Sequence, residues 1–183
     1  HVLKHDLIQA NRKFNRLQAD TQFSLHLLTI RLFEIDQNQK KAEALQDSEP
    51  IEASQIVQDA TTNLQRILKD LKYIHLYNEK KQSFLHSAKQ LQEQLEVLVD
   101  EYNLVLDQSL KIVFDESFGQ LPIMEQALNT GDVEIVKSTY DQMEGRLQHI
   151  HSQVKQNIEL KQQLPQDLTL IEESLAQLQK ATQ

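Results

Sequence analysis

Apolar or small residues between Gln82 and Phe118 recur at alternating steps of three and four positions. This spacing places them in one stripe along one side of a helix. The stripe consists of Ala88, Leu91, Leu95, Leu98, Tyr102, Val105, Ser109 and Ile112. Polar residues flank it, and no Gly or Pro occurs before Gly119. The segment is therefore predicted to be a helix that packs one face against other helices, as in a coiled coil.

Residues that break helices are rare in the whole chain, which has three Gly and three Pro among 183 residues. Leu, Gln, Glu, Lys and Ala are abundant, and these residue types favour helices over strands. The sequence thus predicts an all-α fold, an elongated antiparallel bundle of three to four long helices with coiled-coil or spectrin-like packing. We expect residues 1–183 to form a single domain.

The apolar spacing and the turn residues together set the expected helix bounds. The expected helices span about 2–46, 51–77, 82–118, 121–129, 132–164 and 167–181. Pro50 suits the first turn of a helix, Gly131 a left-handed cap, and Asp132 the start of the following helix. Pro165 is expected to end or kink the fifth helix.

Residues 77–82 place two successive polar residues, Asn78 and Lys81, on the expected stripe. This favours a turn, although one uninterrupted helix with a polar layer remains the alternative.

Between Phe23 and Ile35 the apolar residues also include Leu27, Ile30 and Phe33, so this segment is expected to be covered on more than one side.

The net charge of −8 is spread along the chain, and the summed field repels phosphate backbones and anionic lipid heads. Nucleic acid is therefore not an expected partner. The chain has no cysteine, which excludes disulfides and thiolate chemistry, and it has no apolar run long enough to span a bilayer. Because it starts at His1 rather than Met, a mature form or an excised domain is expected, with any membrane anchor outside this sequence.

The sequence carries no motif for metal binding or catalysis. His149 and His151 would point about 200° apart on a helix, so they cannot share one metal ion. The Glu-x-x-His motifs of di-metal helical bundles are missing, as are the glycine motifs of nucleotide sites and nucleophile elbows. We expect no enzyme activity, no cofactor and no metal.

The predicted interaction surface lies at the bundle tips, since the helix faces are generic and the tips alone vary in chemistry. It consists of Asn78, Lys80, Lys81, Asn129 and Asp132. Lys80 and Lys81 supply positive charge on an acidic protein, which would suit an anionic cell-wall polymer or an acidic partner protein. The alternative is that these lysines only keep a turn hydrated.

The order of helices and turns resembles that of the YkyA-type cell-wall-binding lipoproteins of Gram-positive bacteria. The residues that carry the resemblance are 78–82, before the Ala88 stripe, and 127–132, which lead to Tyr140 and Met143. The resemblance covers most of the chain, but this chain is acidic and rich in Gln where that family is rich in Lys, and it lacks the lipid-bearing Cys. It implies an extracytoplasmic, cell-envelope-anchored protein without catalysis, and it transfers no binding residue.

Three functional hypotheses follow. The first is a non-catalytic interaction or structural protein outside the cytoplasmic membrane, such as a lipoprotein associated with the cell envelope. The second is the ligand-sensing helical bundle of a bacterial transmembrane receptor, whose two ends must reach the same side of a membrane. The third is a cytoplasmic coiled-coil adaptor, which the same apolar spacing permits.

Overall fold

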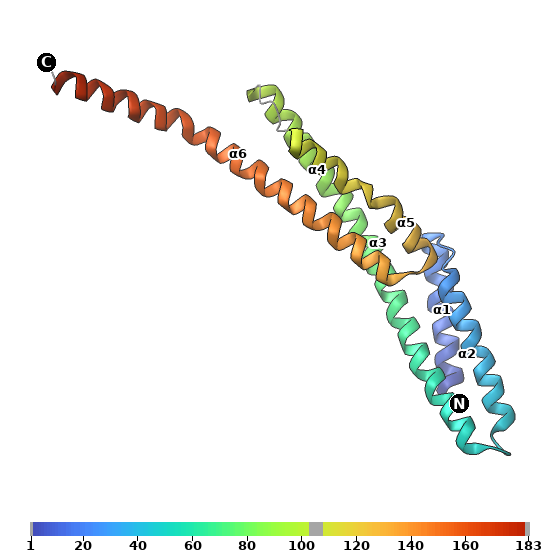
Figure 1. Cartoon of the computed structure of the whole chain (residues 1–183). Coiled ribbons are helices and arrows are strands. Elements are labelled where there is room, and N and C mark those ends of the chain that lie inside the picture. The colour runs from blue at the N-terminus through green and yellow to red at the C-terminus, as the bar shows by residue number, and fades with distance from the viewer. Residues whose placement is uncertain (1, 103–107, 182–183) are drawn as a thin grey trace.

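The computed structural model describes the backbone of residues 2–102 and 108–181, and the side chains of 2–96 and 112–181. The described residues form α-helices and turns and contain no strand. The helices are α1 (Val2–Thr21), α2 (His26–Leu45), α3 (Pro50–Tyr102), α4 (Gln108–Gly119), α5 (Leu121–Thr130) and α6 (Val133–Ala181). Long antiparallel contacts join α2 to α3 and α3 to α6. The predicted all-α, antiparallel and elongated architecture is confirmed (Figure 1).

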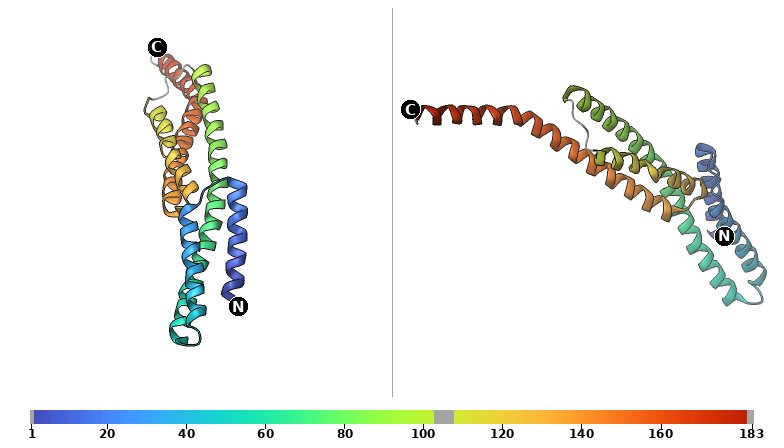
Figure 2. Two further views of the ribbon diagram at one scale, coloured as in Figure 1. Left: turned by 90° about the vertical axis from the view of Figure 1, so that its right-hand side faces the viewer. Right: turned by 45° about the horizontal axis from the view of Figure 1, so that its top comes forward.

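The helices form two bundles that share α3 (Figures 1 and 2). In the first bundle, α1 and α2 pack on the N-terminal half of α3. In the second, the C-terminal half of α3 packs with α4, α5 and the beginning of α6. The C-terminal part of α6 leaves the other helices and projects alone.

The first helix boundary was predicted wrongly, because the expected helix 2–46 is two helices, α1 and α2. The chain reverses at residues 22–25, where Gln22 and Leu25 adopt left-handed φ values of 58° and 48°. Such values are uncommon outside glycine and persist only where the surroundings hold them. Here the Leu25 side chain is fully buried and its N–H donates to the Asn129 carbonyl at 2.7 Å. The stabilising contact comes from 104 positions away and leaves no local sequence signal.

The favoured turn at residues 77–82 was also wrong, because α3 continues through it. The core stripe passes through Tyr77 and Phe84, both buried, instead of Asn78 and Leu85. Lys81 lies on this core stripe with its aliphatic stem covered. Its ammonium group pairs with the Glu125 carboxylate of α5 at 3.5 Å. The alternative of one uninterrupted helix is therefore correct, and Tyr77 and Phe84 supply buried side chains where that alternative expected a polar layer.

The expected helix 82–118 is divided between α3 and α4, and residues 103–107 lie outside the described part. Ala88, Leu91 and Leu95 of the predicted stripe are buried, whereas Ile112 is exposed. The side chains of Leu98, Tyr102, Val105 and Ser109 are outside the described set. The Phe118 ring of α4 packs against the Phe84 ring of α3, with centroids 6.0 Å apart.

The predictions for α5 and α6 were correct at their starts, and the predicted end of a helix at Pro165 was wrong. Gly131 has a left-handed φ of 85°, and Asp132 accepts the Ile135 N–H at 3.3 Å, as a helix cap does. The expected helices 132–164 and 167–181 are one helix, α6, which contains Pro165. Pro165 removes one backbone hydrogen bond of α6 and its ring crowds the preceding turn of the same helix, in a stretch where every residue from 162 to 181 is exposed.

The expected cover over α2 is only partial. Leu28, Leu32 and Ile35 are buried, but Leu27, Ile30 and Phe33 are exposed by 38%, 53% and 63%. The reason is that α1 packs chiefly on α3 and touches α2 little, so the outer side of α2 has no neighbour within the described chain.

Candidate interface at the bundle junction

The two bundles meet at a junction formed by the α1–α2 turn (22–25), the α5–α6 turn (129–132) and the middle of α3 (70–81). Asn129 holds the two turns together. Its side-chain oxygen accepts the Ser24 N–H at 2.9 Å, and its carbonyl accepts bonds from the Ser24 hydroxyl at 3.1 Å and from the Leu25 N–H. Asn129 therefore serves a structural purpose.

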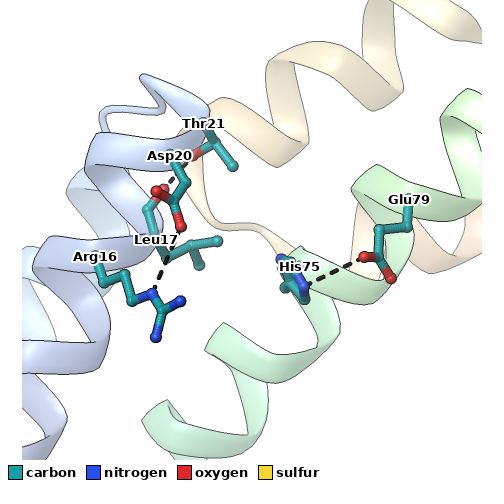
Figure 3. A network of polar contacts seen from close by, with 6 residues as sticks. All are labelled: Arg16, Leu17, Asp20, Thr21, His75 and Glu79. Carbon is teal, nitrogen blue, oxygen red and sulfur yellow. Dashed lines mark hydrogen bonds and ion pairs between the residues drawn. The ribbon is translucent and has the colours of Figure 1, made fainter.

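The α1 side of the junction is shown in Figure 3. The polar pairs drawn there are Arg16 with Asp20 at 3.9 Å, Thr21 with the Leu17 carbonyl at 2.6 Å, and His75 with Glu79 at 3.4 Å. Each pair lies within one helix. These contacts support α1 and α3 individually and do not connect the helices.

The predicted interaction surface does not lie at a tip of the bundle. Asn78, Lys80 and Lys81 lie in the middle of α3, and Asn129 and Asp132 lie in the turn that docks on α1 and α2. The structure does bring both groups to the same junction. Lys80, Lys81, Asn129 and Asp132 each make an intramolecular contact. Their role in binding a partner stays a prediction.

Lys80 and Lys81 show this engagement most clearly. The Lys80 ammonium group lies 5.1 Å from the centre of the Tyr77 ring and 5.2 Å from that of Tyr140 on α6. Both distances allow cation–π attraction. Lys81 is 11% exposed and pairs with Glu125. Lys81 is therefore paired with a carboxylate, whereas Lys80 keeps its charge and lies close to the two rings.

A different group of cations gathers around a cleft of about 310 Å³ on the junction. We name this the junction cleft; its lining residues are Arg31, Arg66, Lys69, Asp70, Tyr73, Val133, Glu134 and Lys137. Helices α2, α3 and α6 each contribute at least one cation. Four basic side chains face two carboxylates, a local surplus of positive charge on a protein of net charge −8.

The cations of the junction cleft differ in how they are held. Arg31 donates to Asp70 at 2.6 Å, and both side chains are partly covered. The Lys69 ammonium group lies 5.8 Å from the centre of the Tyr73 ring. Arg66 and Lys137 are exposed and form no ion pair with any described residue. The cleft thus combines one fixed cation with three that can turn toward a ligand.

The sequence reasoning missed the junction cleft. Arg31, Arg66, Lys69 and Lys137 are widely separated, and only the packing of three helices brings them together. Arg66 and Lys69 do share the three-residue spacing that puts two side chains on one helix face. That spacing is common on helix surfaces and is too weak a signal to identify a site.

The described residues contain no cluster of three or more His, Asp or Glu arranged to hold a metal ion. A second groove, between α3 and α6, has a volume of about 600 Å³, and its lining includes three Ser and three Gln side chains. Its one His, His151, forms no hydrogen bond or ion pair with another side chain of the described residues. Within the described helices, no segment is long and apolar enough to cross a membrane.

Comparison with known proteins adds no family. The resemblance to YkyA-type lipoproteins therefore stays a prediction. No protein-family model, curated protein or solved structure matches this chain.

Proposed function

We propose that this chain is a non-catalytic helical interaction protein that binds an acidic segment of a partner protein in the junction cleft. The observation that carries the proposal is the surplus of cations from three helices around one cleft of an otherwise acidic molecule. Such a local field attracts acidic groups and steers their approach.

Several features of the junction cleft favour a protein segment over a uniform polyanion. Asp70 and Glu134 interrupt the positive charge, which would repel a densely charged polymer. Tyr73 offers an aromatic surface, and the exposed Leu27 lies one helical turn before Arg31 on α2. A segment that carries both carboxylates and apolar side chains would use all of these contacts.

The location in the cell envelope and the lipid anchor stay predictions. The sensor alternative is less compatible with the structure, because Val2 and Ala181 lie toward opposite ends of the molecule (Figures 1 and 2). A domain between two membrane spans needs both ends on one side.

The proposal is tested with a fluorescein-labelled peptide of alternating Glu and Leu residues, whose binding is followed by fluorescence anisotropy. We expect Arg66→Glu/Lys69→Glu to weaken binding by about tenfold or more, which corresponds to ~1.4 kcal/mol. The control is Arg12→Glu/Lys13→Glu, which makes the same charge change at two exposed positions of α1. Binding of the parent should also weaken as salt is raised.

Equal loss in both double variants would show that only net charge matters and would contradict the proposed cleft. Retention of binding in Arg66→Glu/Lys69→Glu would do the same. A parent that binds inorganic polyphosphate but not the peptide would contradict the protein partner and would favour the anionic polymer.

A further inference from the structure

The seam of α6 continues past the point where the bundle ends. Its buried part steps by fours and threes through Val136, Tyr140, Met143, Leu147, Ile150 and Val154. The next two positions in this rhythm are polar, Asn157 and Lys161, and apolar residues then resume. The resumed seam begins with Leu164, Leu168, Ile171 and Leu175.

These four side chains are exposed by 56%, 51%, 55% and 54%, and every residue from 162 to 181 is exposed. No described helix runs beside this part of α6, and Figures 1 and 2 show it directed away from the rest of the molecule. The bundle of the same chain therefore cannot cover the seam. Two polar positions separate it from the intramolecular core, so it forms an independent apolar face.

We infer that residues 160–181 of α6 pair with the same segment of a second copy of this chain, in an antiparallel two-stranded coiled coil. The seam is self-complementary in this direction: Leu168 of one copy faces Ile171 of the other, and Leu164 faces Leu175. The pairing repeats on both sides of a twofold axis. Such an interface is isologous and closes as a dimer.

The charges that flank the seam select the antiparallel direction. In a parallel pair, Asp167 of each copy would lie beside Glu172 of the other, which places like charges together twice. In the antiparallel pair, Asp167 lies beside Ser174, and Glu172 lies beside Pro165, so each carboxylate meets an uncharged neighbour. The antiparallel pair also keeps the two bundles at opposite ends of the dimer, where they do not collide.

Oligomeric state tests the inference directly. Sedimentation equilibrium of the parent over a concentration series should show a dimer. Leu168→Asp places an unpaired carboxylate in the seam and should weaken dimerisation by at least tenfold. Leu170→Asp is the matched control, because Leu170 is exposed by 61% on the same helix but lies off the seam. Both positions are outside the bundle, so circular dichroism should show unchanged helix content for both variants.

The direction of pairing is tested with a spin label. The chain has no cysteine, so Glu159→Cys provides a single labelling site. In the antiparallel dimer, position 159 of one copy lies level with position 180 of the other. The two labels are therefore about 30 Å apart along the axis, which is 21 residue steps at ~1.5 Å each. In a parallel dimer they would be separated only by the width of the helix pair. A monomeric parent, a dimer that Leu168→Asp leaves intact, or a short label distance would each overturn the inference.

Discussion

The Lys80 ammonium group lies close to the rings of both Tyr77 and Tyr140, and these two rings meet edge to face with centroids 5.5 Å apart. This arrangement lets α3 keep a lysine close to a core seam, because the ring faces replace part of the water around the charge. The hydroxyl of Tyr140 donates to Glu144 at 3.3 Å. Lys80 and Tyr77 of α3 thus contact Tyr140 of α6, and Glu144 supports Tyr140 from within α6.

Burial raises the pKa of Tyr140 to about 12, and the nearby Glu144 carboxylate contributes to the increase. The pKa of Tyr77 is also raised, first by burial and then by Asp141. Both shifts favour the neutral phenol in the folded state. Their contribution to stability is therefore complete below the ordinary tyrosine pKa of 10.0 and is lost as the pH rises toward the folded values.

We expect the free energy of unfolding to fall between about pH 10 and about pH 12, as Tyr140 is forced to ionise. Tyr140→Phe should show a smaller fall over the same interval, since it has no proton to lose there, and the remaining fall should reflect Tyr77. Urea denaturation at a series of pH values measures this. An identical pH dependence in the parent and in Tyr140→Phe would show that the ring is not buried as described.

At single residues, the predictions were correct where the conformation depends on neighbours in the sequence. They failed where it depends on residues far along the chain. Gly131 and Asp132 were assigned correctly because a left-handed cap and a helix start depend on neighbouring residues only. The environments of Lys80 and Lys81 depend on Tyr140 and Glu125, which lie far along the chain. No spacing rule within α3 reveals those partners.

At the scale of elements, α3 is continuous because Tyr77 and Phe84 continue its buried stripe where polar residues interrupt the expected one. Tyr77 and Phe84 are 5% and 4% exposed, while Asn78 between them is half-buried. Tyr77 follows Ile74 by three positions and Phe84 precedes Ala88 by four, so the buried stripe keeps helical spacing through this segment. The sequence pattern could not decide this, because either set of positions keeps helical spacing.

Asn78→Pro tests the continuity of α3. Proline in a helix interior removes a backbone hydrogen bond and clashes with the preceding turn, which costs about 3 kcal/mol or more. We expect a loss of that size in urea denaturation, because Asn78 lies far from either end of the helix. Asn78→Ala is the control and should change stability by less than about 1 kcal/mol, since Ala favours helices. A proline variant as stable as the alanine variant would restore the turn at residues 77–82.

For the whole molecule, the sequence was sufficient for the fold class and the antiparallel arrangement, and insufficient for the division into two bundles. That division follows from the reversal at residues 22–25, where Leu25 has a left-handed φ of 48° without any Gly or Pro. The α5–α6 turn stabilises it from the second bundle. The junction cleft follows from the same docking, because Lys137 of α6 lies near Arg66 of α3 only when that turn is in place.

The junction therefore couples the two bundles through few contacts, and Asn129 is the residue that most of them share. Its side chain accepts the Ser24 N–H, while its carbonyl is an acceptor that any residue would keep. Replacing the side chain alone removes one bond across the junction. It leaves the cores of both bundles intact.

We expect Asn129→Ala to lower the free energy of unfolding by about 1 kcal/mol, the net value of one partly exposed hydrogen bond. Because the lost bond joins the bundles, calorimetry should also show a broader transition as the bundles begin to unfold separately. Asn63→Ala is the matched control, since Asn63 is exposed on α3 and forms no side-chain bond with a described residue. If both variants unfold with the midpoint and width of the parent, the Ser24–Asn129 contact does not couple the bundles, and α3 alone connects them.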